Sequence, residues 1–131
     1  MASVFTRIIN GELPGHVPYR DHQCFVLMSI NPIAPGHSLV IPRTEIDQWS
    51  DLEHDVAAHL MVVAQRVSRA LRIAFPCERV GLIIAGFEVA HCHLHVIPAR
   101  GMQDMDFSRA ATHINHDELA QHASTLANHL S

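Results

Sequence analysis

The chain has 131 residues, of which 48% are hydrophobic and 17% are charged, and its formal net charge is −4 at pH 7. This composition excludes a disordered chain, and the length suits one domain with its own buried core. The negative net charge excludes a general nucleic-acid binder with a basic surface. No apolar run approaches the roughly 18 residues that a membrane-spanning helix needs. We therefore expect no nucleic-acid partner and no membrane partner.

The cysteines and histidines indicate the cellular compartment and the candidate functional residues. The three cysteines, Cys24, Cys77 and Cys92, have no close pairing, and residues 1–10 lack the charged and apolar segments of a secretory signal. These features predict reduced thiols in a cytoplasmic protein. The chain also holds 12 histidines, and histidine titrates near neutral pH, binds metals and acts as a nucleophile.

The first third of the chain predicts three strands. Residues 16–20 and 24–30 are rich in strand-forming side chains and are separated by a short polar segment, so a hairpin is expected there. Residues 31–36 contain two prolines and a glycine and are expected to form a loop. A third strand is expected over residues 37–42, ending at a proline.

A long helix is expected in the middle of the chain. Ser50 and Glu53 have the spacing of a capping box, in which a hydroxyl and a carboxylate satisfy the first free amides of a helix. Apolar residues then recur every three or four positions from Leu52 to Ala74, which is typical of an amphipathic helix. Pro76 is expected to end it.

The second half predicts two more strands and a last helix. The strands are expected over residues 80–85 and 88–97, and residues 101–115 are polar and expected to be irregular. Asn115 is placed to cap a final helix. Its apolar positions are Leu119, Ala123, Leu126 and Leu130. The order of strands, helix, strands and helix indicates an α+β domain with a helix packed on one face of a sheet.

Three alternating histidines are the most informative feature. Side chains of a strand alternate between its two faces, so His91, His93 and His95 are expected to share one face. Imidazoles on an apolar strand are costly unless they are hydrogen-bonded or liganded. The intervening side chains are expected to point into a core: Cys92, Leu94 and Val96. From the pattern alone two functions remain open, a metal site and a histidine nucleophile that attacks phosphorus.

Three segments resemble the histidine triad (HIT) superfamily. They are the His-x-His-x-His run over 91–95, the sequence INPIAPGHSLVIP over 30–42, and IINGELP over 8–14. The resemblance implies an α+β HIT-like fold, with an antiparallel sheet of about five strands, one long helix and a C-terminal helix. It also implies a single HIT domain over residues 1–131, with a core over 3–100 and a C-terminal loop and helix over 101–131.

The resemblance assigns a role to each of four histidines. His93 matches the nucleophile that becomes nucleotidylated, and His91 and His95 match the pair that orients it and manages protons. His37 matches a fourth histidine on the neighbouring strand that completes the network. The other eight histidines are expected to be solvated surface residues.

The resemblance also implies a nucleotide site. Leu13, Leu27 and Ile30 match apolar positions that sandwich a purine, and Ser29 stands where many relatives carry an acidic ribose ligand. The backbone amides of a further segment are expected to face the phosphates: Gly86, Phe87, Glu88 and Val89. An ionised Glu88 would repel those phosphates, whereas a carboxyl with a raised pKa would act as a general acid.

Two departures from the family pattern affect ligands. Ser3, Thr6 and Glu45 replace two cysteines and a histidine that bind a structural zinc in many bacterial relatives, so no structural zinc and no other cofactor are expected. The segment before the triad is shortened, and Phe87 stands where relatives carry a glutamine that contacts the nucleotide. The reaction class is therefore expected to persist while the preferred substrate changes.

The function implied is an enzyme of the HIT family, a hydrolase or nucleotidyl-transfer enzyme. It is expected to cleave at the α-phosphate of a nucleoside phosphoramidate or a related nucleotide conjugate through a covalent nucleotidyl-histidine, with a purine nucleotide as ligand. A homodimer is also implied, with the long helix and a sheet edge at the interface. Two alternatives are a nucleotide-binding regulatory module without turnover and a metal-binding protein that uses the HxHxH face.

Overall fold

The computed structural model describes residues 2–130. The elements in chain order are α1 (Val4–Ile9), β1 (Tyr19–Arg20), β2 (Cys24–Met28), β3 (Ser38–Pro42), α2 (His54–Ala74), β4 (Arg79–Ile83), β5 (Leu94–Ala99) and α3 (His116–Leu130). Short 3-10 helices lie over Trp49–Asp51, Met102–Met105 and Phe107–Arg109. The five strands form one antiparallel sheet in the order β1-β2-β3-β5-β4. This confirms the predicted α+β class, with about five strands, one long helix and a C-terminal helix.

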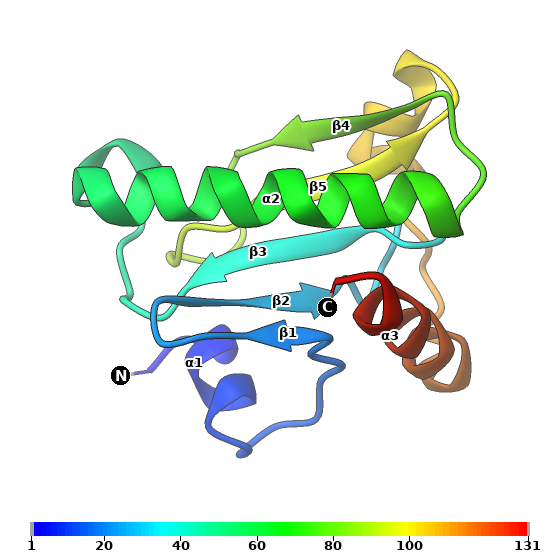
Figure 1. Ribbon diagram of the computed structural model, residues 1–131. Helices are drawn as coiled ribbons and strands as arrows, with labels where there is room; N and C mark the ends of the chain where they lie inside the picture. Colours follow the sequence, from blue (N-terminus) through cyan, green and yellow to red (C-terminus); the bar gives the residue numbers. More distant parts are fainter. Residues whose placement is uncertain (1, 131) are drawn as a thin grey trace.

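Helix α2 covers one face of the sheet, and α3 packs beside it (Figure 1). The three- and four-residue spacing of its apolar residues puts Leu60, Val67 and Leu71 on one side, each at most 1% exposed. They belong to the larger core cluster, which also takes alternate residues of the strands, such as Val40 of β3 and Val96 of β5. None of the helices within residues 2–130 is long and apolar enough to cross a membrane.

The opposite face of the sheet carries a smaller core cluster and helix α1. Phe5 of α1 packs there with Phe25, Leu27, Leu39 and Ile41. No element was predicted for this segment, because six residues rich in β-branched and aromatic side chains have little helix propensity. Burial of the Phe5 ring, which is 6% exposed, supplies the stabilisation that propensity does not.

Several predicted boundaries were wrong. The strand expected over 16–20 is only β1, Tyr19–Arg20. Residues 49–51 form a 3-10 turn, and α2 starts with Glu53 as its N-cap without a side-chain cap hydrogen bond, so the predicted capping box at Ser50 does not form. The strand expected over 88–97 is β5, Leu94–Ala99. Its shift has a structural cause, because Gly86 has a φ of +87° and the chain bends before pairing with β3 begins at Leu94.

The C-terminal part follows the prediction more closely. Asn115 caps α3, with its side-chain oxygen accepting a hydrogen bond from the Glu118 amide at 3.1 Å. Leu119, Leu126 and Leu130 are the buried residues of α3. Within residues 101–115 the chain is irregular apart from its two short 3-10 helices. The last of these, Phe107–Arg109, lies against the candidate site described next.

Candidate functional site

Four histidines meet on the face of the sheet that lies away from α2. His37 immediately precedes β3, His95 lies on β5, and His91 and His93 lie in the bend that leads into β5. All four are buried, with exposures of 2% for His37 and 0%, 4% and 8% for His91, His93 and His95. The side chains between them, Cys92, Leu94 and Val96, belong to the cluster beneath α2. The predicted alternation of faces is therefore confirmed, although only His95 lies on a regular strand.

The hydrogen bonds of His93 leave one ring nitrogen free. Its Nδ1 lies 2.8 Å from the carbonyl oxygen of His91. A carbonyl only accepts, so in the neutral ring Nδ1 carries the hydrogen and Nε2 carries the lone pair. The ring of Phe5 packs edge-on against His93 with the centroids 5.0 Å apart, which limits rotation of the imidazole.

His37 and His95 form a pair whose protons are fixed by the backbone. The amide of Ile33 donates to His37 Nδ1 at 3.0 Å, so the hydrogen of neutral His37 lies on Nε2. That Nε2–H donates to His95 Nδ1 at 3.0 Å, which places the hydrogen of neutral His95 on Nε2. The His37–His95 pair therefore presents His95 Nε2–H as a hydrogen-bond donor.

Burial keeps both members of this pair neutral near pH 7. Burial, with the nearby His95 and His93, lowers the pKa of His37 to about 3. Burial, with His93, lowers the pKa of His95 to about 4. No buried side-chain nitrogen or oxygen atom of residues 2–130 lacks a hydrogen-bond partner. The Nε2 atoms of His93 and His95, which have none from the protein, therefore reach solvent.

His91 holds the site to its surroundings. Its Nε2 donates to the carbonyl oxygen of Pro42 at 2.6 Å, so its neutral Nδ1 accepts from the Ser3 hydroxyl at 2.5 Å. Burial lowers its pKa, which favours this neutral form. Ser3 is also the N-cap of α1, where its side-chain oxygen accepts from the Thr6 amide. His91 therefore ties α1 to β3 and fixes the carbonyl that orients His93.

The residues around Ser3 do not suit a structural zinc. The Ser3 amide donates to Glu45 Oε1, and hydrogen bonds from Thr6 and Ser3 lower the pKa of that carboxyl. Two hydroxyls, a carboxylate and one imidazole contain no thiolate, and the imidazole nitrogen facing them is already hydrogen-bonded to Ser3. The expectation of no structural zinc stays a prediction, which metal analysis of the purified protein tests.

The expected purine-binding residues differ in their surroundings. Leu27 is 3% exposed and lies in the smaller core cluster, so most of its surface is used in packing. Leu13 is half-buried, whereas Ile30 is 44% exposed. The Ser29 amide donates to the carbonyl oxygen of His37 at 3.0 Å, which places it beside the histidines. Of the apolar three, Ile30 offers the most surface to a ligand.

The segment expected to face phosphates is a solvent-exposed bend. Gly86 adopts a positive φ, and the Phe87 side chain is 97% exposed. Glu88 is exposed as well, so the structure offers no burial in support of a general acid role. Val89 is half-buried and packs on the smaller core cluster. Their contacts with phosphate stay predictions.

Two site residues were missed by sequence reasoning. Ser3 was considered only as a lost zinc ligand, yet it caps α1 and hydrogen-bonds His91. Phe107 lies in the polar segment after β5, and its ring packs against His95 with the centroids 4.8 Å apart. The available signal was that Phe107 is the single aromatic residue in residues 101–115.

One more cluster involves histidine. Within residues 2–130, only Asp21, Cys24 and His59 bring three potential metal ligands within 4.8 Å of one another. One Asp21 oxygen already accepts hydrogen bonds from the Tyr19 hydroxyl and from His59, both at 2.7 Å. His59 was expected to be a solvated surface residue, and this was wrong, because the contact with the β1–β2 turn half-buries it. The same expectation was wrong for His16 and His122, which are half-buried as well. The four site histidines do not converge in this way, so the structure gives no support to the metal-binding alternative.

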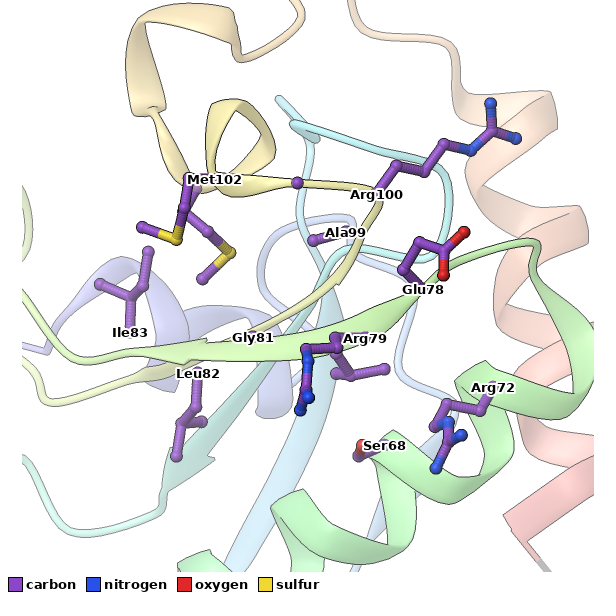
Figure 2. A pocket seen from close by; sticks show the side chains of 13 residues that line it. Ser68, Arg72, Glu78, Arg79, Gly81, Leu82, Ile83, Ala99, Arg100 and Met102 are labelled. Atoms are coloured by element: carbon purple, nitrogen blue, oxygen red, sulfur yellow. The ribbon is translucent and has the colours of Figure 1, made fainter.

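A groove lies elsewhere, at the β4 edge of the sheet. It has a volume of about 1170 Å³ and runs between β4, the end of α2 and the segment after β5. Figure 2 shows Ser68 and Arg72 of α2 facing Arg79 and Leu82 of β4 across it. None of the four histidines lines it.

Known proteins resemble this chain in sequence and in fold. The HIT domain matches residues 10–102. A Zn-bound histidine triad family protein from Mycobacterium smegmatis has a TM-score of 0.82 and 28% identity, with 99% of this chain and 94% of that chain covered. A hypothetical histidine triad nucleotide-binding protein from Sulfolobus tokodaii strain 7 has a TM-score of 0.81 and 26% identity, covering 96% and 90%. A HIT family hydrolase from Legionella pneumophila Philadelphia 1 has a TM-score of 0.64 and 29% identity, covering 77% and 96%.

These similarities extend over the site as well as the fold. The matched range contains His37 and all three histidines of the 91–95 run. It begins before β1 and ends after β5, so it includes the whole five-stranded sheet and α2. The chain therefore belongs to the HIT domain family.

Proposed function

We propose that this protein is a hydrolase or nucleotidyl-transfer enzyme that cleaves at the α-phosphate of a nucleoside phosphoramidate or a related nucleotide conjugate. The observation that carries this proposal is the hydrogen bond from His93 Nδ1 to the His91 carbonyl. It directs the lone pair of Nε2 away from the backbone and makes that atom the nucleophile. The related structures described as a nucleotide-binding protein and as a hydrolase support the ligand and reaction class.

The reaction has two steps. His93 Nε2 attacks the α-phosphorus, the P–Nε2 bond forms, and the bond from phosphorus to the leaving nitrogen breaks while that nitrogen takes up one proton from solvent. Water then attacks phosphorus, the P–Nε2 bond breaks, and one proton returns to solvent. Through both steps His95 Nε2–H is a fixed donor for a phosphate oxygen or the leaving atom, because the Ile33 amide holds the His37–His95 pair in one tautomer.

The nucleotide is assigned to residues that surround the four histidines. We place the purine against Ile30, Leu13 and the accessible edge of Leu27, with Ser29 near the ribose. The phosphates would lie along the amides of residues 86–89, where Gly86 has no atom within 4 Å of the position of a Cβ. An open backbone of this kind permits close approach of a phosphate.

The test is intact-protein mass spectrometry with adenosine 5′-phosphoramidate, with nucleotide release followed in parallel. Wild type is expected to release AMP and to show a transient nucleotidyl adduct, and His93→Ala is expected to show neither. His54→Ala is the matched control, because His54 is an exposed histidine at the start of α2. Binding of the nucleotide without release or adduct would refute turnover and favour the nucleotide-binding module.

We also propose a homodimer that uses the β4 edge and α2. β4 is an edge strand with free backbone groups, and Leu82 on it is 40% exposed. The outer side of α2 adds exposed apolar side chains, with Met61 and Val62 at 52% and Ile73 at 71%. Leu82→Arg is expected to halve the molar mass measured by light scattering. Val4→Arg, at a site of similar exposure on α1, is the control and is expected to leave the mass unchanged.

The cysteines support a cytoplasmic location, which we propose as well. Cys24, Cys77 and Cys92 are all free thiols, and Cys24 and Cys92 are buried in the larger core cluster. Burial raises the pKa of Cys92 to about 11 and contributes to raising that of Cys24 to about 12. Such thiols are unreactive packing groups that a reducing compartment preserves. Fractionation of cells that express a tagged protein tests the location.

A further inference from the structure

Phe107 borders the catalytic pair without being sealed into the core. Its ring lies 4.8 Å from the ring of His95, at an interplanar angle of 67°. The side chain is 37% exposed, so part of it remains open to solvent. An aromatic ring at such a place either orients the histidine or contacts the substrate.

The position of Phe107 is fixed by hydrogen bonds at both ends of its turn. On one side, the Asp106 side chain accepts from the Ser108 amide at 2.9 Å. On the other side, the Ala111 amide donates to the carbonyl oxygen of Pro32 at 2.9 Å, and Asn31 Nδ2 donates to the carbonyl oxygen of Ala111 at 2.8 Å. The turn is therefore fastened to the loop that leads into His37.

In the proposed reaction His95 Nε2–H can donate to the leaving atom. A nucleophile displaces its leaving group in line, so the leaving atom lies opposite His93 Nε2. The fixed donor available to it is His95 Nε2–H, whose ring is in contact with Phe107. A leaving group hydrogen-bonded to His95 therefore has the open part of the Phe107 ring as its neighbour.

We infer that Phe107 forms the wall of a leaving-group subsite that selects flat, apolar leaving groups, such as aryl or benzyl amines, over polar ones. The inference rests on the proposed function and narrows its substrate class. Aromatic contacts contribute about 0.5–1.5 kcal/mol beyond area burial, which corresponds to about a 2- to 12-fold preference.

The experiment compares two adenosine phosphoramidates whose leaving groups are benzylamine and ethanolamine, amines of similar basicity. Wild type is expected to show the higher kcat/KM for the benzylamine compound. Phe107→Ala is expected to lower that preference by about 5-fold. Phe107→Leu, which keeps apolar area without the ring, is expected to be intermediate. Ile114→Ala is the matched control, because Ile114 lies in the same segment and is 38% exposed.

The outcomes separate this inference from the proposed function. If wild type turns over neither compound, the proposed function fails. If wild type turns over both and Phe107→Ala keeps the wild-type preference, only the Phe107 subsite is refuted. If Phe107→Ala slows both compounds equally, with an unchanged thermal midpoint, Phe107 is a positioning residue for His95 and the subsite is refuted as well.

Discussion

Replacing His37 by glutamine tests whether the His37–His95 pair is held neutral by burial. The pKa of His37 is lowered to about 3 and that of His95 to about 4, against an ordinary value of 6.5. The unfolded chain therefore binds more protons than the folded protein below pH 6.5. The two neutral histidines therefore make their full contribution to the free energy of unfolding above pH 6.5. That contribution falls as the pH drops toward about 4. His37→Gln keeps a neutral polar side chain and removes one of the two groups responsible.

The expected size of the effect follows from the shifts. For each histidine whose pKa is lowered, the free energy of unfolding falls by about 1.4 kcal/mol per pH unit below the unfolded pKa. Between about pH 7 and about pH 5 this amounts to about 2 kcal/mol for each histidine. Wild type is thus expected to lose about 4 kcal/mol from His37 and His95 over this range, and His37→Gln about 2 kcal/mol less than wild type. Urea unfolding at the two pH values measures the difference.

The control is His22→Gln, which removes an exposed histidine and is expected to keep the wild-type loss. A His37→Gln variant that loses as much stability as wild type between the two pH values would refute the reasoning. It would mean that His37 is protonated in the folded protein. The Ile33 amide could then not donate to His37 Nδ1, and the tautomers of His37 and His95 would no longer be fixed.

Three further changes have expected effects on unfolding by urea. Ser3→Ala removes the α1 cap and the hydroxyl bonded to His91, and is expected to cost about 1–2 kcal/mol. Leu71→Ala empties a fully buried position of α2 and is expected to cost about 2–5 kcal/mol. Burial opposes the ionisation of Asp21, but hydrogen bonds from Tyr19, His59 and two backbone amides outweigh it and hold its pKa well below the usual range. Asp21→Asn is therefore expected to cost about 2 kcal/mol at neutral pH, a loss that shrinks as the pH falls and the native carboxylate protonates.

The fold could be predicted from the sequence because its main elements have clear periodicity. Alternating residues placed the histidines and Leu94 on opposite faces, and the three- and four-residue spacing placed Leu60 and Leu71 under α2. Asn115 was a reliable cap because its side chain bonds an amide three residues away and needs no distant partner. These patterns involve residues that are close in sequence, so they can be recognised without the tertiary structure.

The contacts that complete the site could not be predicted in this way. Helix α1 exists because Phe5 packs on strand residues such as Phe25 and on two histidine rings. These rings lie 86 and 88 residues away in sequence. Ser50 failed as a cap because the chain tightens into a 3-10 turn that buries Leu52. Phe107 reaches His95 only through hydrogen bonds between its segment and the loop before β3. Tertiary contacts decide each of these, and no spacing rule encodes them.

The backbone, rather than further side chains, sets the chemistry of the triad. Pro42 and His91 carbonyls fix the tautomers of His91 and His93, and the Ile33 amide fixes that of the His37–His95 pair. Side chains that hold a nucleotide can therefore change without changing which nitrogen attacks. Under the proposed function, we expect the exposed Phe87, which stands where relatives carry a glutamine, to weaken substrate binding and to leave the nucleophile unchanged. For this reason we expect the altered positions of this chain to change KM and the choice of leaving group before they change the covalent step.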